Sequence, residues 1–310
     1  MIVQLAGHDP EVMLQAARLV EDKCDAVDIN LGCPQGIAKR GRYGAFLMEE
    51  LDLLHDIVRT LSSNLKIPVT CKTRIYKDFD RSIRLCETLV NAGASMLTIH
   101  GRTREEKGQY VAEADWEMIR RIKEHFGNRV PIIANGGISS LDDVERCLEY
   151  TKCDGVMSSE AILENPTLFC TKCSLTPLTQ IEVAEEYLSY CQKYPSAFIR
   201  QARSHLMRIL HRYLHKHTDI RDRLTEGKSW DEFNDIVRYI REIAYDNDND
   251  YQDIWYSRYR NINRVLINSS LDIKSGVYGD DEIWDCSSNT NDGSLFSGLQ
   301  MFDDDNDNNQ

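Results

Sequence analysis

The stretch VDINLGCPQG, residues 27–36, passes from a run of apolar and β-branched residues into a turn that carries a cysteine. Runs of this kind, bounded by glycine and proline, are typical of strands. A cysteine that only fills space belongs inside an element, because free cysteine is among the most buried residue types. Cys33 stands instead between a glycine and a proline on the loop that leaves the strand. Such a fixed, exposed thiol can serve as a proton donor or a nucleophile.

Short apolar runs alternate with amphipathic stretches over the first 170 residues. The expected strands are 2–6, 26–30, 68–75, 96–100, 130–135 and 153–159. The expected helices are one that follows Asp9-Pro10, then 46–64, 79–93, 113–127 and 139–151. Strands that are apolar throughout, each followed by a helix, predict parallel strands covered on both faces.

Polar side chains end almost every expected strand, namely Asn30, Lys72 with Arg74, His100, Asn135, and Ser158 with Ser159. In a (β/α)8 barrel the carboxyl ends of all strands face the active site, whereas a doubly wound sheet binds its ligand at one switch point. The pattern therefore predicts an α/β fold, a (β/α)8 TIM barrel. Six strand–helix units are two short of a closed barrel, so we expect either an open sheet or a chain that begins two strands late, and we favour the second.

After about residue 175 the pattern changes to helices only, expected at 178–194, 197–217 and 229–244. We predict an N-terminally incomplete catalytic barrel over 1–175, an all-α helical domain over 176–245, and an acidic, mostly disordered tail over 246–310. The tail holds 14 acidic and 4 basic side chains, so it carries −10 of the net charge of −13. Such a composition buries too little apolar surface to offset chain entropy.

The middle of the expected helical domain is basic. Residues 196–223 contain seven Lys or Arg against two Asp. Arg208, Arg212 and Lys216 follow one another at helical spacing and predict a basic stripe. Contact with a phosphate backbone and an ordinary solvated helix face explain this stripe about equally well.

Composition and spacing argue against several other classes. The longest apolar runs are far too short to span a membrane. Ten cysteines without pairing rhythm, and no signal peptide, predict reduced thiols in the cytoplasm or nucleus.

Cys170 and Cys173 have CxxC spacing, but no second pair follows at zinc-site distance, so no metal site is expected. Neither GxGxxG nor a Walker sequence occurs, which argues against a Rossmann dinucleotide site.

Two features at strand ends indicate a phosphate-bearing ligand. Lys72 interrupts an apolar strand, where a lysine is costly to bury unless it meets an anion or an electron-rich ring. The turn Asn135-Gly136-Gly137 precedes a helix, and backbone amides at such a turn can hold phosphate. Phosphate sites at the late strands are usual in barrels that bind flavin mononucleotide or sugar phosphates. Taken singly, each feature also fits a structural role.

Five segments resemble, in family order, those of the tRNA-dihydrouridine synthases. They are DINLGCPQGIAKRGRYGAFL (28–47), VTCKTRIY (69–76), LTIHGRTREEKGQ (97–109), IIANGGISSLDDV (132–144) and DGVMSSEAILENPTLF (154–169). GCPQ followed by YGAFL most resembles the eukaryotic branch that acts on D-loop uridines 16 and 17 of tRNA. The basic helical region is similar, less specifically, to the family's tRNA-binding helical domain.

The resemblance implies that NADPH or NADH reduces bound FMN, and that reduced FMN delivers hydride to C6 of a flipped-out uridine. It also implies that Cys33 is the acid that protonates C5. Residues expected to hold the flavin are Gln4, Lys72, His100, Asn135, Gly136, Gly137, Ser159 and Glu160. Expected tRNA contacts are Asn30, Lys39, Arg40, Arg42, Arg102, Arg200, Arg208, Arg212 and Lys216.

Two departures from the family pattern stand out. The family's first two barrel strands have no counterpart in this sequence. Ser159-Glu160 stands where many bacterial members have Gly-Arg, and a glutamate cannot neutralise phosphate.

Two alternatives therefore stay open: an FMN barrel that reduces a small pyrimidine, and an inactive tRNA-binding remnant of the family. We expect a monomer that binds tRNA and neither a membrane nor a metal.

Overall fold

Six parallel strands form one sheet in the order β1-β2-β3-β4-β5-β6. The computed structural model describes residues 1–108, 111–170, 177–194 and 199–246. The strands are β1 (Ile2–Leu5), β2 (Ala26–Leu31), β3 (Val69–Arg74), β4 (Leu97–His100), β5 (Ile132–Asn135) and β6 (Gly155–Met157). All six strand predictions are confirmed. Because the spatial order follows the sequence order without reversal, the sheet has the winding of a (β/α)8 barrel, of which six strands are present.

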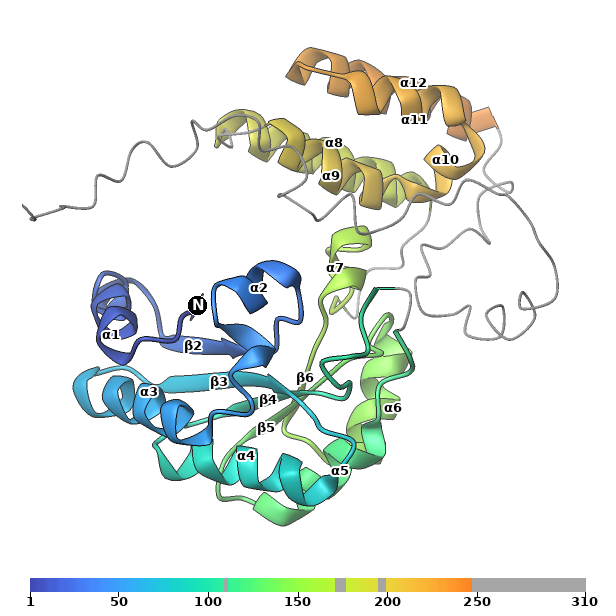
Figure 1. The fold of residues 1–310 in the computed structure, drawn as a ribbon. Helices are drawn as coiled ribbons and strands as arrows, with labels where there is room; N and C mark the ends of the chain where they lie inside the picture. Colours follow the sequence, from blue (N-terminus) through green and yellow to red (C-terminus); the bar gives the residue numbers. More distant parts are fainter. Residues whose placement is uncertain (109–110, 171–176, 195–198, 247–310) are drawn as a thin grey trace, which may run out of the picture. The chain divides into compact units, whose positions relative to one another are not determined.

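Helices cover the outer face of this sheet (Figure 1). They are α1 (Pro10–Arg18), α3 (Leu51–Asn64), α4 (Phe79–Asn91), α5 (Trp116–Phe126) and α6 (Leu141–Thr151). Several start where a side chain accepts a hydrogen bond from the first turn, as Asp9 does from the Val12 N–H over 2.9 Å. Shorter helical turns are η1 (Glu21–Lys23), α2 (Gly36–Arg40), η2 (Gly44–Phe46) and α7 (Glu160–Glu164). The helix expected at 46–64 begins only at Leu51, because η2 ends at Phe46 and a turn follows it.

The two faces of the sheet differ in chemistry. Outward side chains such as Ile29 and Ile99 are fully buried in one hydrophobic cluster under the helices. The inner face is polar, because the parallel register aligns polar residues across the strands. The aligned rows are Gln4, Asp28 and Thr70; then Asn30, Lys72 and Thr98; then Arg74, His100 and Asn135. The later rows lie toward the carboxyl edge, where a barrel of this kind carries its active site.

The chain continues into helices only. These are α8 (Pro177–Lys193), α9 (Ile199–Ile209), α10 (His211–Lys216), α11 (Thr218–Glu226) and α12 (Trp230–Asp246). They share a second hydrophobic cluster that includes Leu206, Tyr213 and Phe233. The single helix predicted over 197–217 is wrong, since the chain breaks at Leu210, and α11 was not expected. The domain limits at 175 and 245 stay predictions, and the tail beyond Asp246 lies outside the described residues.

Seven cysteines of the described part are free thiols, and five of these are buried. Cys170 is disulfide-bonded, so the prediction of reduced thiols is wrong for this residue. Within the described ranges, no helix combines the length and apolarity needed to cross a membrane. The same residues contain no group of three or more His, Cys, Asp or Glu placed to hold a metal ion.

Candidate active site

Cys33 lies on the loop between β2 and α2, at the carboxyl edge of the sheet; residues 32–35 are called the Cys33 loop below. The N–H groups of Gly32 and Cys33 both donate to Asn30 Oδ1 over 3.0 Å. The Cys33 carbonyl accepts from the Ala45 N–H, also over 3.0 Å. Gly44 packs against it with φ +67°, and a Cβ there would lie 2.7 Å from the Cys33 carbonyl oxygen. Cys33 itself is partly exposed, so its thiol is both fixed and reachable.

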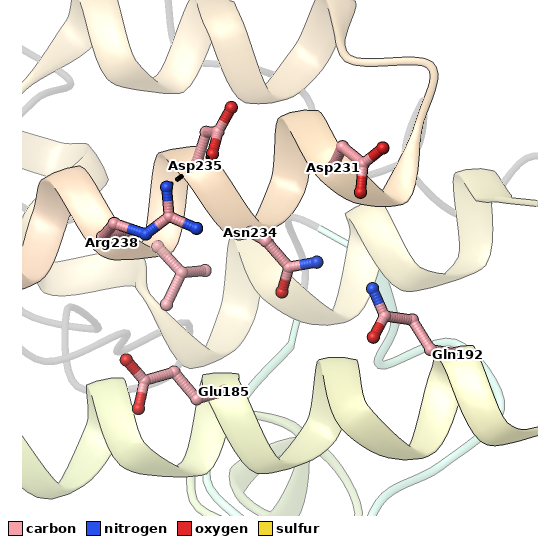
Figure 2. Close-up of a pocket in the computed structure, with 7 residues that line it drawn as sticks. Glu185, Gln192, Asp231, Asn234, Asp235 and Arg238 are labelled. Carbon is pink, nitrogen blue, oxygen red and sulfur yellow. Dashed lines mark hydrogen bonds and ion pairs between the residues drawn. The ribbon is translucent and has the colours of Figure 1, made fainter.

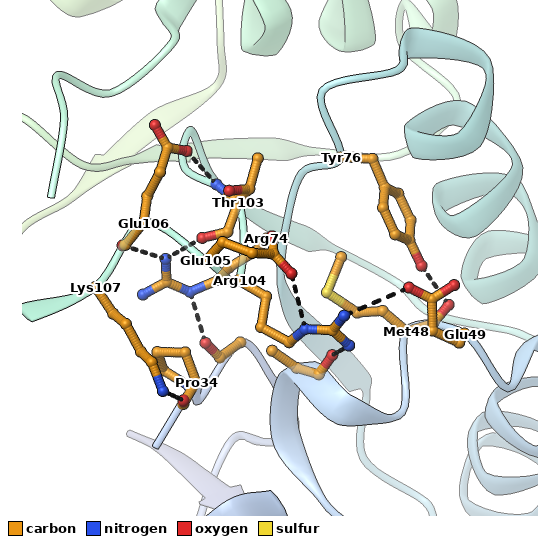
Figure 3. A network of polar contacts seen from close by, with 12 residues as sticks. Pro34, Met48, Glu49, Arg74, Tyr76, Thr103, Arg104, Glu105, Glu106 and Lys107 are labelled. Carbon is orange, nitrogen blue, oxygen red and sulfur yellow. Dashed lines mark hydrogen bonds and ion pairs between the residues drawn. The ribbon is translucent and has the colours of Figure 1, made fainter. Parts of the chain in front are cut away.

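Two cations brace the Cys33 loop, Arg74 at the end of β3 and Lys107 in the segment that follows β4 (Figure 3). Arg74 Nε donates to the Gly32 carbonyl over 2.8 Å, and Arg74 Nη1 donates to the Thr103 carbonyl over 2.8 Å. Lys107 Nζ donates to the Pro34 carbonyl over 2.8 Å. Charge-assisted hydrogen bonds of this kind are stronger than neutral ones. The backbone on both sides of Cys33 is therefore tied to neighbouring strands and loops.

Lys72 and His100 lie on the inner face beside this loop. Lys72 forms no hydrogen bond or ion pair with any residue that the structure describes, and burial together with the Arg74 charge lowers its pKa to about 8. The amine therefore stays mostly protonated at neutral pH. Burial, with the charges of Arg74, Lys72 and Arg102, lowers the pKa of His100 to about 2. Arg102 Nη1 lies 3.2 Å from His100 Nε2, and because arginine only donates, the neutral ring carries its proton on Nδ1.

The turn after β5 has the geometry of an anion site. Gly136 and Gly137 have φ +102° and +77°, and a Cβ on Gly136 would lie 2.9 Å from both the His100 ring and Ala114. Over the described part of the chain, no group accepts a hydrogen bond from the N–H of either glycine. Successive N–H groups in such a conformation form a concavity that binds anions. Asn135 is committed elsewhere, since its Nδ2 donates to the Met157 carbonyl over 2.9 Å.

A buried hydroxyl adds to the case for a ligand on this face. Thr98 Oγ1 is buried between the Lys72 and β5 positions and has no hydrogen-bond partner among the described residues. Buried polar groups in native proteins are nearly always paired. An unpaired hydroxyl, an ammonium and an anion-binding turn on one sheet face fit the predicted flavin mononucleotide.

The other predicted cofactor residues lie near the same edge. Gln4 is exposed on β1, and its amide bridges Asp28 and Asn30 over 2.7 and 2.8 Å. Ser159 is exposed before α7 and makes no side-chain capping bond, and Glu160 is the first residue of that helix. Their contacts with a cofactor stay predictions.

The predicted tRNA contacts divide by exposure. Lys39, Arg40, Arg42, Arg200 and Lys216 are exposed. Three others are buried, namely Arg102, Arg208 and Arg212, with 4%, 4% and 1% of their surface exposed. The predicted basic stripe is therefore not exposed at Arg208 and Arg212, which are buried on α9 and α10. Arg102 Nε donates to the Ala112 carbonyl over 2.6 Å, and its Nη1 lies 3.2 Å from His100 Nε2.

An open hollow of about 480 Å³ lies between α8 and α12 (Figure 2). Its lining includes the carboxylates of Glu185, Asp231 and Asp235, and the last of these pairs with Arg238 over 2.8 Å. An acidic lining repels phosphate. This hollow is therefore a poor place for RNA, and the strand-end site remains the candidate active site.

Sequence reasoning missed the residues that hold the site together. Asp28 and Thr70 share the inner face with the predicted residues, and Gly44 fixes the turn against Cys33. Period-two alternation back from Asn30 would have placed Asp28 on the inner face. Nothing in the sequence marks the close approach of Gly44.

Comparison with known proteins gives a consistent result. The family model for "Dihydrouridine synthase (Dus)" matches residues 1–245. The tRNA-dihydrouridine(16/17) synthase (NAD(P)(+)) of Saccharomyces cerevisiae is 42% identical over 255 residues, which are 79% of this chain and 60% of that protein.

Two further relatives agree. The "tRNA-dihydrouridine(16/17) synthase (NAD(P)(+))-like" protein of Rattus norvegicus is 44% identical over 74% of this chain and 51% of its own length. The tRNA-dihydrouridine(16/17) synthase (NAD(P)(+)) of Schizosaccharomyces pombe is 39% identical over 78% of this chain and 63% of its own. The chain thus spans between about half and two thirds of the length of these relatives.

Proposed function

Since the chain belongs to the dihydrouridine synthase family, we propose that it reduces the C5–C6 double bond of uridine in tRNA. The observation that carries this proposal is the thiol of Cys33, held partly exposed at the carboxyl edge of the sheet and interacting with the charge of Lys72. The names of the relatives support D-loop positions 16 and 17 as the target and NADPH or NADH as the reductant.

Cys33 is the proposed proton donor. Flavin mononucleotide, when bound, supplies the hydride that C6 of the uracil ring receives. The Cys33 S–H bond breaks as a C–H bond forms at C5, so the ring gains one hydride and one proton. The thiolate that remains interacts with the charge of Lys72. Water can then return the proton to sulfur through the open side of the loop.

Several groups would hold the cofactor. The N–H groups of Gly136 and Gly137 would bind its phosphate, and Lys72 and His100 would contact its ring. Neutral His100 donates through Nδ1, because Arg102 already occupies Nε2. Gln4, Asn135, Ser159 and Glu160 remain proposed contacts on the same edge.

The substrate has to leave its stack, because C5 and C6 of a stacked uridine are covered. Lys39 and Arg40, in the last turn of α2, are exposed close after Cys33 in the chain and would bind phosphates that flank the flipped base. Arg200 and Lys216 are exposed on the helical part and would add sequence-independent contacts.

The proposal is tested by supplying the protein with FMN, NADPH and unmodified tRNA, then measuring dihydrouridine by nuclease digestion and mass spectrometry. We expect flavin absorbance in the protein and loss of D-loop uridines. A flavin-loaded protein that leaves tRNA unchanged would contradict the proposal. Salt-sensitive tRNA binding without any flavin would support an inactive remnant, and turnover of free uracil that tRNA does not inhibit would support a small-pyrimidine reductase.

A further inference from the structure

We propose that Asp28 is a positioning residue that sets the Cys33 loop through a chain of hydrogen bonds running in one direction. Asp28 is the central residue of the innermost polar row, with 7% of its surface exposed. The Asp28 side chain accepts hydrogen bonds from Thr70 and Gln4, and it forms none with Cys33 or with the Gly136-Gly137 turn. Its influence would pass through Gln4 and Asn30, two residues that the chain brings together from adjacent strands.

The first links join β3, β2 and β1. Thr70 Oγ1 donates to Asp28 Oδ1 over 2.6 Å, and Gln4 Nε2 donates to Asp28 Oδ2 over 2.7 Å. Asn30 Nδ2 then donates to Gln4 Oε1 over 2.8 Å. Each distance is within the normal range for a hydrogen bond. The carboxylate thus anchors two amide side chains in succession.

The last link reaches the Cys33 loop. Asn30 Oδ1 accepts the N–H groups of both Gly32 and Cys33 over 3.0 Å. This is the side-chain-to-backbone bonding by which asparagine organises a turn. One amide oxygen therefore holds the two residues at the start of the Cys33 loop.

The direction of the chain is fixed from both ends. An ionised carboxylate only accepts hydrogen bonds, so Gln4 has to present its NH₂ group to Asp28 and its oxygen to Asn30. A backbone N–H only donates, so Asn30 has to present its oxygen to the Cys33 loop and its NH₂ group to Gln4. The two requirements agree. Removing the Asp28 carboxylate takes away the acceptor at one end, so Gln4 loses its anchor and holds the Asn30 amide less firmly.

The environment of Asp28 explains how the carboxylate is kept on the inner face. Burial raises its pKa, while the hydrogen bonds from Thr70 and Gln4 and the charge of Lys72 oppose that rise. The hydrogen bonds from these two donors therefore replace those that water gives to an exposed carboxylate. Thr70 anchors Asp28 but stands outside the path to Cys33, which makes it a matched control.

Amide hydrogen exchange at Gly32 and Cys33 tests the chain without any turnover. Asp28→Ala is expected to speed exchange at both amides about tenfold, as the loss of one charge-assisted hydrogen bond predicts. Thr70→Val removes a hydrogen bond from the same carboxylate and is expected to change exchange at these amides less than about twofold. Gln4→Met cuts the chain at an exposed residue, so the test does not depend on the folding of Asp28→Ala.

A double-mutant cycle shows whether Asp28 acts through Asn30. Asn30→Ala should speed exchange at Gly32 and Cys33 at least as much as Asp28→Ala, and adding Asp28→Ala to it should have no further effect. Alkylation of Cys33 by iodoacetamide, followed by peptide mass spectrometry, gives a second readout. The proposal would be overturned if the effects of Asp28→Ala and Asn30→Ala on exchange were additive. It would also be overturned if Thr70→Val and Asp28→Ala had equal effects, or if exchange were unchanged in both Asp28→Ala and Gln4→Met.

The functional consequence rests on the proposed role of Cys33, but the exchange experiment does not. If the protein reduces no uridine, the proposed function fails while the protection of these two amides remains as predicted. If uridine is reduced but hydrogen exchange at Gly32 and Cys33 is unchanged by substitution of Asp28, only the present inference fails.

Discussion

Replacing Gly44 by alanine tests whether Cys33 is held by a close backbone approach. Residue 44 has φ +67°, where a side chain costs roughly 1–2 kcal/mol. The added Cβ would lie 2.7 Å from the Cys33 carbonyl oxygen and 2.9 Å from the Cys33 Cβ. Carbon atoms in contact normally stay about 3.5 Å apart. Neither neighbour is the end of a flexible side chain, so the Cys33 loop itself has to move by roughly 0.5–1 Å.

Two effects follow from this crowding. Overpacking a well-packed site costs about 1–3 kcal/mol, so the variant should lose about 2–5 kcal/mol of unfolding free energy. A reacting group misplaced by about 1 Å can slow a reaction about 100-fold. We therefore expect Gly44→Ala to melt at a lower temperature and to reduce tRNA uridine roughly 10- to 100-fold more slowly, with flavin still bound.

Gly36→Ala is the matched control, because Gly36 directly follows the Cys33 loop and a Cβ there meets nothing within 4 Å. It should keep the wild-type rate and gain about 0.4–1 kcal/mol from a less flexible unfolded chain. The assays are thermal melting and single-turnover oxidation of reduced flavin by tRNA. A wild-type rate and melting temperature in Gly44→Ala would refute the argument from close approach.

Three further outcomes are expected. Gly136→Ala places a Cβ 2.9 Å from the His100 ring and should weaken FMN binding about tenfold or more in a fluorescence titration. Hydrogen bonds from Arg129 lower the pKa of Glu87 from 4.5 to about 2. The pairing therefore stabilises the fold at neutral pH, and this stabilisation is lost as the pH falls from 4.5 to about 2. Glu87→Gln should flatten this part of the acid-denaturation curve. Arg212→Ala should lower the melting temperature because its side chain is buried, whereas Lys216→Ala should leave it unchanged and reduce the salt slope of tRNA binding by about 1.

The sequence was most informative about the sheet. Each strand prediction is confirmed, because apolar runs bounded by glycine, proline and polar residues leave few alternatives. The place of Cys33 on the loop was also predictable, since Gly32 gives the backbone freedom to turn and Pro34 stiffens the exit. Lys72 and His100 were expected at the carboxyl ends of their strands, and the register places them in neighbouring rows of the inner face.

Other features depend on contacts between distant segments. The basic stripe is not exposed as predicted, since Arg208 and Arg212 are buried. The helix also breaks at Leu210, where neither glycine nor proline marks a stop. The role of Asp28 depends on how β1 and β3 align with β2, and alternation within one strand carries no information about that register. The contact of Gly44 with Cys33 likewise arises only once the loop has folded back on itself.

The central claim is that the Cys33 thiol supplies the proton for C5 of uridine. Its most direct test is the rate at which tRNA oxidises pre-reduced, flavin-loaded protein in a single turnover, compared between Cys33→Ala and Cys24→Ala. Cys24 is the other partly buried free thiol of the described part and lies outside the site, donating to the Val20 carbonyl over 3.2 Å. We predict a wild-type rate for Cys24→Ala and a rate about 100- to 10,000-fold lower for Cys33→Ala, with equal flavin content. Equal rates in the two variants would contradict the account.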